Sequence, residues 1–286
     1  MAGTESAGTH TVVPGRRGLG AIFWGAVAWI VMIVAAAVFA PWLPLPSPTD
    51  MDMLGSRAPP SLAHWLGTDA LGRDVASRII YGARTSLTVG LVAPLIGLVL
   101  GGAAGMLAGY FRGRFDTVIV GGVDVLLAFP PLVLALAVAA YLGQSLQNMI
   151  LILGVLGIPA FTRVARATTL TFAQREFVTA ARALGATHTR ILLHELLPNV
   201  ILPLGAFLLV AVAVTIVVEG SLSFLGVGVP PPSPSWGSMI GEGRESLDTA
   251  AWLAFVPAGV LFATVLSFNL VGDTLRAMTD PHRAAN

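Results

Sequence analysis

"LGAIFWGAVAWIVMIVAAAVFA", residues 19–40, is a run of 22 residues without a charged side chain. An α-helix rises about 1.5 Å per residue, so a run of this length can cross the roughly 30 Å of hydrocarbon in a bilayer. Arg16 and Arg17 precede the run, as they would in a signal peptide, but the apolar part of a signal peptide is only about 7–15 residues long. We therefore predict a retained transmembrane helix over residues 19–40, preceded by an N-terminal tail over residues 1–18.

The rest of the chain is also apolar. Of its 286 residues 55% are hydrophobic and 11% are charged, whereas roughly a quarter of the residues of a soluble domain are charged. Nearly uncharged stretches follow at 84–112, 116–163, 195–219 and 248–273. The turn-like GQSLQN at 143–148 divides the second stretch into two spans, of which the latter, Met149 to Thr162, is short and contains Pro159. These runs predict an all-α polytopic membrane protein with six transmembrane helices, five of them in a core over residues 85–275.

All 16 basic side chains are arginines, and their distribution predicts an orientation. If the N-terminus is cytoplasmic, the segments on the cytoplasmic side hold 11 arginines and those on the outer side hold 5. Short cytoplasmic loops of membrane proteins are enriched in basic residues. We therefore expect both termini to be cytoplasmic, including a tail over residues 276–286, and we expect residues 41–84 to form an extracytoplasmic loop.

The residue types that are missing exclude several functions. Without cysteine there is no thiolate site, and without lysine there is no phosphate-binding loop of the GxxxxGK[ST] type. The five histidines lie outside the predicted spans, which argues against an intramembrane serine protease. His188 and His194 are six residues apart, a spacing that does not place two metal ligands on one helical face, so we predict no metal site. A net charge of +1 gives no reason to expect a nucleic-acid partner.

The outer loop changes character before the second span. Its start is rich in proline, and it continues as GTDALGRDVASRIIYGARTSL, residues 67–87. Asp74 and Arg78 are four residues apart, and Val75, Ile79 and Leu87 could share an apolar face. This pattern predicts a short amphipathic surface helix that leads into the second span.

Small residues recur at every fourth position of the second span. They are Gly97, Gly101, Gly105 and Gly109, preceded by Ala93. Such a stripe allows the backbone of another helix to approach closely. It predicts tight helix packing, against either another helix of this chain or a second chain.

Asp124 is the only acidic residue well inside a predicted span. A charged side chain at the centre of a bilayer costs about 2.5–3.5 kcal/mol by insertion scales, so some contact must offset this cost. Asp124 could line a water-filled translocation path, pair with an arginine, or lie close enough to the cytoplasmic end to remain hydrated.

The polar stretch EFVTAARALGATHTRILLHELLPN, residues 176–199, reads as two short helices joined at Gly185. Four residues of the first helix, Phe177, Ala180, Ala181 and Leu184, form one apolar face. Gly185 can adopt the left-handed conformation that ends a helix, and Thr187 can cap the second helix. Pro198 suits the first turn of the following span. The stretch predicts a compact elbow within a cytoplasmic loop over residues 170–197, although an amphipathic connector lying on the membrane would explain the apolar face equally well.

TAARALGATHTRILLHELLP within this elbow resembles the loop of bacterial ABC importer permeases, whose pattern is EAA, three residues, G, nine residues, I, any residue, LP. Ala180, Ala181, Gly185, Leu197 and Pro198 match this pattern. The chain has Thr179 where the pattern has glutamate, and Glu195 where it has isoleucine. Glu176 can supply an acidic group one turn earlier.

Two outer segments narrow the resemblance. HWLGTDALGRDVASRIIYGARTSL, residues 64–87, and EGSLSFLGVGVPPPSPSWGSMI, residues 219–240, are similar to segments of the second permease, often called the C-type subunit, of dipeptide, oligopeptide and nickel importers. The resemblance implies a type I importer permease with the MetI-like fold, in the inner or plasma membrane of a bacterium. It implies as partners a second permease, two ATPase subunits and an extracytoplasmic substrate-binding protein, besides membrane lipid.

In this family the elbow is the coupling helix, which seats in a groove of an ATPase subunit. The resemblance implies ATPase coupling for these residues of the elbow: Glu176, Phe177, Ala180, Ala181, Arg182, Leu184, Gly185, Arg190 and Pro198. It implies docking of the binding protein or gating for these outer residues: Asp69, Arg73, Asp74, Glu219, Pro231, Pro232 and Trp236. ATP and Mg²⁺ would be bound by the partner subunits, and this chain would hold no cofactor and catalyse no reaction. The expected cargo is a dipeptide or oligopeptide, with nickel, haem or glutathione import as alternatives, and a secondary transporter as the reading outside this family.

Overall fold

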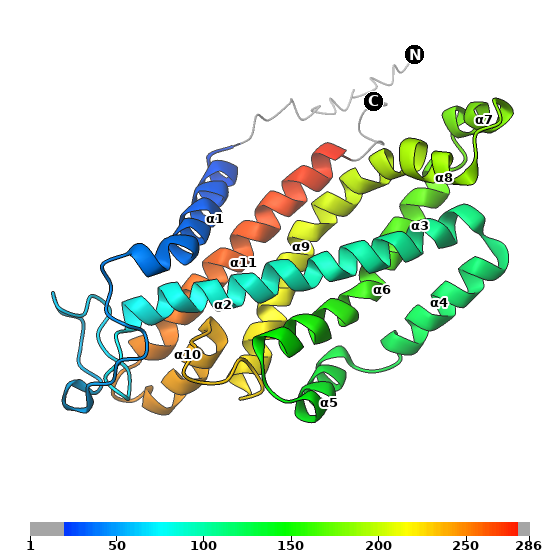
Figure 1. Cartoon of the computed structure of the whole chain (residues 1–286). Coiled ribbons are helices and arrows are strands. Elements are labelled where there is room, and N and C mark those ends of the chain that lie inside the picture. The colour runs from blue at the N-terminus through cyan, green and yellow to red at the C-terminus, as the bar shows by residue number, and fades with distance from the viewer. Residues whose placement is uncertain (1–19, 280–286) are drawn as a thin grey trace, which may run out of the picture.

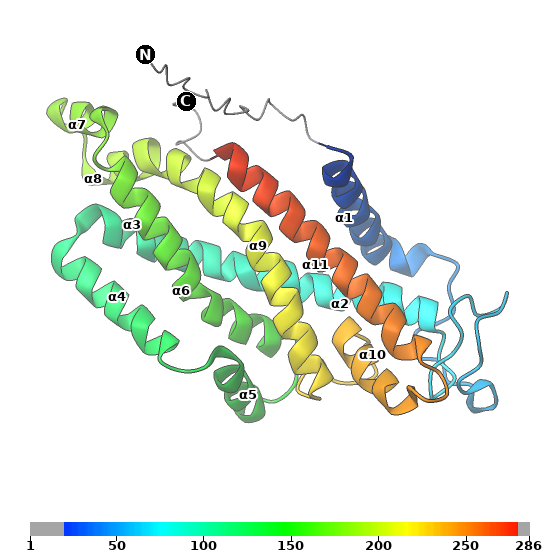
Figure 2. The same cartoon turned by 180° about the vertical axis from the view of Figure 1, so that it is seen from behind.

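The computed structural model describes residues 20–279, and its elements in this range are helices (Figures 1 and 2). The tail predicted over residues 1–18 and the last seven residues of the C-terminal tail lie outside the described residues. The α-helices are α1 (Ala21–Phe39), α2 (Val75–Ile96), α3 (Gly102–Phe111), α4 (Gly113–Leu127), α5 (Pro131–Leu142), α6 (Leu146–Phe172), α7 (Glu176–Ala183), α8 (His188–Arg190), α9 (Leu197–Phe224), α10 (Trp236–Gly243) and α11 (Trp252–Thr279). Two π-helical segments, Gly97–Gly101 and Ile191–Leu196, join α2 to α3 and α8 to α9. Three short 3-10 turns complete the set, at Ala40–Trp42, Met53–Gly55 and Arg244–Ser246.

Within the described residues, five continuous helical stretches are long and apolar enough to cross a membrane. A sixth span results if α4 and α5 are counted together, although this pair is bent by 80°. Pro130 and Pro131 lie at the bend, where proline removes a backbone donor and disfavours a helical conformation of the residue before it. The prediction of an all-α polytopic membrane protein is confirmed, and the predicted third span corresponds to the bent pair α4 and α5.

Two expectations about helix ends were wrong. No separate surface helix precedes the second span, because α2 already begins at Val75 and continues without interruption to Phe111. Val75 and Ile79 are buried against α10 and α11 and do not lie on a surface. The fourth span is not short either, because α6 continues past Pro159 to Phe172 and so contains Arg163 and Arg166.

The stripe of small residues on α2 and α3 packs against α6 of the same chain. A Cβ atom added at Gly97 would lie 2.8 Å from the ring of Phe161, and one added at Gly109 would lie 2.8 Å from the carbonyl oxygen of Arg166. Added Cβ atoms at Gly101 and Gly105 would also collide with the backbone of α6. The glycines therefore allow the backbones of the two helices to touch.

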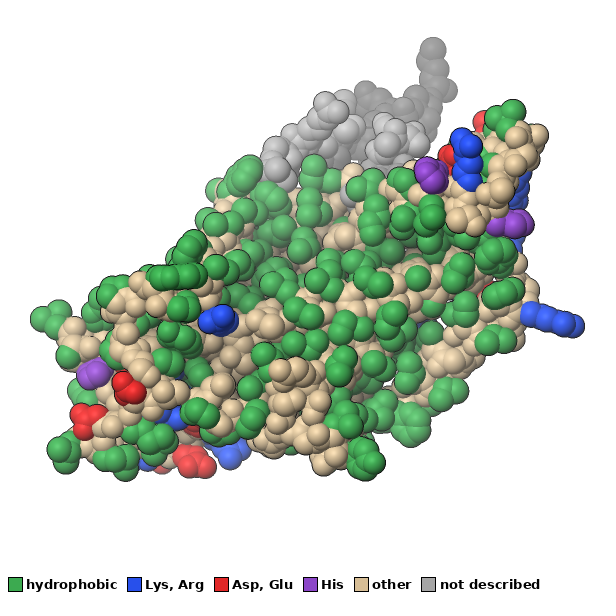
Figure 3. All heavy atoms as spheres, in the orientation of Figure 1, with side chains coloured by type: hydrophobic (Ala, Val, Ile, Leu, Met, Phe, Trp, Pro, Cys, Tyr) green, Lys and Arg blue, Asp and Glu red, His purple; other side chains and the backbone are tan. Residues whose placement is uncertain are grey.

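Charge and apolar surface separate along the bundle. Figure 3 shows hydrophobic side chains over the middle of the visible face, with charged and histidine side chains gathered at two ends. One end carries α7 and α8, and the other carries the loop before α2 together with α10 (Figures 1 and 2). Such a belt between two polar ends is the surface that a bilayer requires.

Candidate functional site

The elbow at residues 176–190 projects beyond the ends of α3 and α9 (Figures 1 and 2). Helix α7 stops at Ala183, and Gly185 has a φ of +79°, in the left-handed region that glycine adopts without strain. Thr187 then caps the next helix, because its side chain accepts a hydrogen bond from the backbone N–H of Arg190. The second helix is not a separate short element, since it continues through the π-helical segment into α9.

A buried contact fixes the elbow to the bundle. Val178 is fully buried on α7, in a cluster with Tyr110 of α3 and with Ile191 and Leu196 of the π-helical segment. This anchor was not among the residues expected to pack. Its effect is to turn the opposite side of α7 outward.

The apolar residues on that outward side are left exposed by the described residues of the chain. Leu184 is 89% exposed and Phe177 is 38% exposed, while Ala180 is also exposed. Next to them lies a hollow of about 400 Å³, lined by residues that include Leu184, Gly185, Arg190 and Glu195. Exposed apolar side chains beside polar ones are typical of protein interfaces.

Tyr110 links the elbow to α3. Its hydroxyl lies 2.8 Å from Nδ1 of His188, and the guanidinium of Arg182 lies 5.4 Å from the centre of its ring. Arg182 therefore already has an aromatic partner in its own chain. Within the described residues, Glu176 and Arg190 are exposed and make no ion pair. These two charges remain available to a partner.

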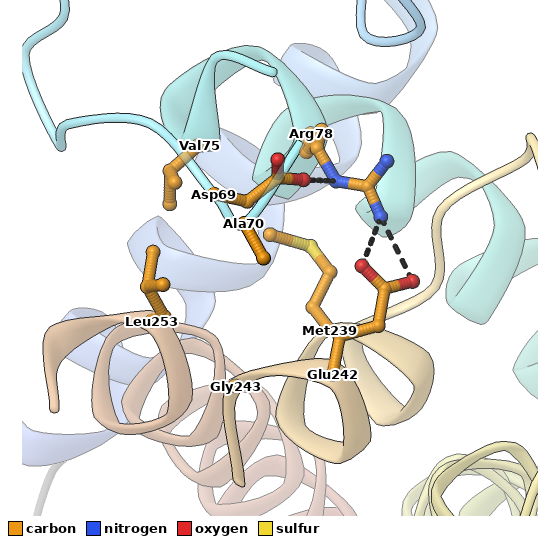
Figure 4. Close-up of a pocket in the computed structure, with 8 residues that line it drawn as sticks. All are labelled: Asp69, Ala70, Val75, Arg78, Met239, Glu242, Gly243 and Leu253. Atoms are coloured by element: carbon orange, nitrogen blue, oxygen red, sulfur yellow. Dashed lines mark hydrogen bonds and ion pairs between the residues drawn. The ribbon is translucent and has the colours of Figure 1, made fainter. Parts of the chain in front are cut away.

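A second set of charges ties the start of α2 to α10 at the opposite end of the bundle (Figure 4). Arg73 and Arg78 both pair with Asp69, at 2.6 and 3.3 Å, and both pair with Glu242, at 2.7 and 3.0 Å. Asp69, Arg73 and Arg78 are buried. Two arginines against two carboxylates leave no net charge, which is how buried charges are tolerated.

The start of α2 carries one further acid. Asp74 caps this helix by accepting a hydrogen bond from the N–H of Ser77 at 2.7 Å, and its other oxygen lies 2.9 Å from Nδ1 of His64. The i, i+4 spacing of Asp74 and Arg78 therefore does not mark an ion pair between them.

Glu219 and Trp236 hold α10 against α2 and α9. Glu219 is fully buried and accepts hydrogen bonds from Ser86 at 2.9 Å and Ser223 at 2.7 Å. The indole N–H of Trp236 donates to the carbonyl of Ile79 at 3.1 Å. Every polar group named in this paragraph has a partner. These contacts and the ion pairs around Glu242 together form what we call the joint between α2 and α10.

Most residues expected to take part in docking of the binding protein or in gating are thus internal. Their burial contradicts direct docking, and a role in gating stays a prediction. Asp69, Arg73, Asp74, Glu219 and Trp236 are all buried within the chain, because each satisfies its polar groups with neighbours on α2, α9 or α10. Pro231 and Pro232 are exposed, and they line a hollow of about 520 Å³ together with Glu242 and Glu245.

Asp124 pairs with an arginine, one of the three environments expected for it. Its Oδ1 accepts a hydrogen bond from Nη2 of Arg163 at 3.0 Å. Nearer the elbow end of the same two helices, Asp116 binds Arg166 through both oxygens, at 2.5 and 2.6 Å. Helices α4 and α6 are therefore joined by two ion pairs.

Sequence reasoning missed several residues that carry these arrangements: Arg78, Tyr110, Arg163, Val178, His188 and Glu242. Arg163 was missed because the fourth span was ended one residue before it. Tyr110 and His188 are 78 residues apart and have no local pattern in common. Among the described residues, no three His, Asp or Glu side chains are grouped so as to hold a metal ion.

Comparisons with known proteins agree with this architecture. Residues 97–284 match the family of the binding-protein-dependent transport system inner membrane component. The chain is 41% identical over 257 residues to the glutathione transport system permease protein GsiD of Escherichia coli (strain 536 / UPEC), covering 90% of this chain and 85% of that protein. It is 39% identical over 254 residues to the protein of the same name from Pectobacterium atrosepticum, covering 88% and 84%.

Among solved structures, the chain is similar to one of the inward-facing MetNI methionine ABC transporter. The TM-score is 0.59 at 19% sequence identity, over 71% of this chain and 96% of the other. At this identity the likeness extends to the fold, and it agrees with the helical arrangement described above.

Proposed function

The chain belongs to the family of binding-protein-dependent transport system inner membrane components, and from this membership we propose that it carries small peptides, glutathione foremost, across a bacterial inner membrane. It is the permease subunit of an ABC importer and spans the membrane several times. Its relatives at about two fifths identity are named for glutathione transport. Glutathione is itself a tripeptide, so this cargo also fits the expectation of a peptide.

The exposed apolar surface of α7 carries the proposal that the elbow couples transport to ATP hydrolysis. Leu184 and Phe177 face outward because Val178 anchors the other side of the helix. An ATPase subunit whose groove receives α7 would cover these side chains, and Glu176 and Arg190 would lie at the rim of the contact. Closure of two ATPase subunits would then move the elbow together with the helices joined to it, by rigid-body switching between two packings.

The remaining parts of the assembly follow from family membership and sequence. A second, different permease would complete the path, and an extracytoplasmic binding protein would deliver the cargo. ATP and Mg²⁺ would be bound by the ATPase subunits, since a chain without lysine has no GxxxxGK[ST] loop. The arginine distribution supports a cytoplasmic position for α7 and for both termini. The joint around Glu242 then lies at the extracytoplasmic end.

Uptake into proteoliposomes tests this function. The complete complex is reconstituted with its binding protein and with ATP on the ATPase side, and labelled glutathione, a dipeptide and a nickel chelate are offered in turn. We expect ATP-dependent accumulation of glutathione, inhibited by excess unlabelled glutathione. Accumulation of the nickel chelate without any peptide would contradict the peptide assignment, and accumulation without ATP would contradict coupling.

A further inference from the structure

The ion pair between Asp124 and Arg163 differs from its neighbour on the same two helices. Asp116 and Arg166 are joined by two hydrogen bonds and are partly buried. Asp124 and Arg163 share one hydrogen bond, and their side chains are 56% and 62% exposed. A guanidinium has five N–H donors and a carboxylate accepts about four hydrogen bonds. Asp124 and Arg163 therefore keep most of their hydrogen-bonding capacity free. Asp116 and Arg166 instead use theirs to hold α4 against α6.

The position of this pair is unusual for exposed charges. Asp124 lies 11 residues after the start of α4, and Arg163 lies nine residues before the end of α6. At about 1.5 Å per residue, each is about 15 Å from the end of the bundle that carries the elbow. That depth lies within a hydrocarbon layer of roughly 30 Å. Charged groups at this depth face protein or water and avoid lipid.

The surroundings of Asp124 on α4 are open. Cβ atoms added at Gly121 or Gly122 would meet no atom within 4 Å. Val118 and Val125 on the same helix are more than half exposed. Helix α4 lies at the edge of the bundle in both views (Figures 1 and 2). The charged pair therefore opens onto space that no described residue of this chain fills.

We infer that Asp124 and Arg163 form a contact site in the translocation path, where they bind the charged groups of a zwitterionic peptide. This inference rests on the proposed function. A carboxylate of the cargo would be bound by Arg163, whose planar fork suits carboxylates. An ammonium of the cargo would be bound by Asp124. An exposed ion pair is weak, so breaking the contact between Asp124 and Arg163 costs little free energy. Each residue then binds the cargo, and the two pair again when the cargo leaves.

Water access at this site is tested with single cysteines in the complete complex, since the natural chain has none. Gly121→Cys lies one turn from Asp124, and its Cβ atom would meet no described residue within 4 Å. The matched control is Phe262→Cys, near the middle of α11 and two-thirds exposed on an apolar surface. We expect a membrane-impermeant methanethiosulfonate to modify Gly121→Cys but not Phe262→Cys, as read from the mass of this chain. If Gly121→Cys stays unmodified in every nucleotide state, the site is covered by lipid or by the second permease, and the inference is overturned.

Recognition of the cargo is tested by uptake of a peptide that the wild-type complex transports. Asp124→Asn and Arg163→Gln should each raise the KM for uptake about tenfold, the change expected for losing one charge-assisted hydrogen bond. ATPase stimulation by the loaded binding protein should persist in both variants. Asp116→Asn should instead lower the yield of assembled complex without changing the KM. An unchanged KM in both Asp124→Asn and Arg163→Gln overturns the inference while leaving the proposed function intact, whereas a wild-type complex that transports no peptide contradicts the proposed function itself.

Discussion

At the scale of single residues, burial separates structural charges from charges that are free to act. Arg78 is almost completely buried and contacts two acids, while Arg163 is mostly exposed and contacts one. Both are arginines in or near membrane-spanning helices, so residue type alone does not distinguish them. Their surroundings do, because a buried charge must be fully paired, whereas an exposed one can change partners.

Replacing Arg78 tests the joint between α2 and α10. Arg78→Met leaves Asp69 and Glu242 with one arginine between them, and breaking a buried ion pair costs about 3–5 kcal/mol. We expect a clear fall in the melting temperature of the purified complex in detergent. Arg84→Met is the control, because Arg84 is exposed on the same helix. This substitution should change the free energy of unfolding by no more than about 0.5 kcal/mol. Equal melting temperatures for the two variants would show that the joint contributes no stability.

At the scale of elements, close backbone contact between α3 and α6 makes one helix pair rigid. Gly105 faces the backbone of Thr162 and Arg166 so closely that even a methyl group has no room. The joined helices α2 and α3 form one span of 37 residues, from the joint around Asp69 to the elbow contact of Tyr110. Two distant ends of the molecule are thereby connected by one continuous helix.

Gly105→Ala tests this contact. Overpacking of a tight interface costs about 1–3 kcal/mol, so we expect a lower melting temperature and a lower yield of inserted protein. Gly205→Ala on α9 is the matched control, because a Cβ atom there meets nothing within 4 Å. Alanine in place of glycine favours an exposed helix by up to about 1 kcal/mol, so this control should be neutral or stabilised. If Gly105→Ala behaves like Gly205→Ala, the backbones do not touch as described.

At the scale of the whole molecule, the two polar ends have different roles. The end that carries α10 is internally satisfied, since its buried charges, Glu219 and Trp236 all find partners in the chain. Among residues 20–279, the elbow end presents exposed apolar side chains and charges that make no ion pair. The elbow therefore offers more uncovered surface to another subunit than the joint around Glu242 does.

Leu184→Asp tests which subunit covers the elbow. An aspartate in an apolar contact carries a desolvation cost of about 1–3 kcal/mol or more, so a tagged chain should lose the co-purifying ATPase. The second permease should remain bound, because α7 is far from the membrane helices that would contact it. Leu184→Met keeps the apolar surface and should retain both partners. Retention of the ATPase by Leu184→Asp would remove α7 from the coupling interface.

Much of the elbow could be predicted because its signals are local. A glycine followed by a capping threonine specifies a helix end and a helix start within three residues, and Gly185 and Thr187 have these roles in the structure. The continuous helix after Thr187 could not be predicted, since the π-helical segment before Pro198 leaves no pattern in the sequence. The surface position expected for residues of docking or gating was wrong for a related reason. Polar residues in a predicted outer segment suggest that their side chains are exposed. Asp69 and Glu219 are instead buried by elements far away in the chain.

The sequence by itself determined the membrane class, the helical fold and the position of the elbow, because apolar runs, caps and glycines act over short distances. Only the tertiary structure decided which charges are internal and which are open. It placed Glu242 beside Arg73 and Arg78, and it placed Arg163 beside Asp124, across separations of 169, 164 and 39 residues. Burial depends on what other helices bring to a side chain, and that depends on packing between distant segments.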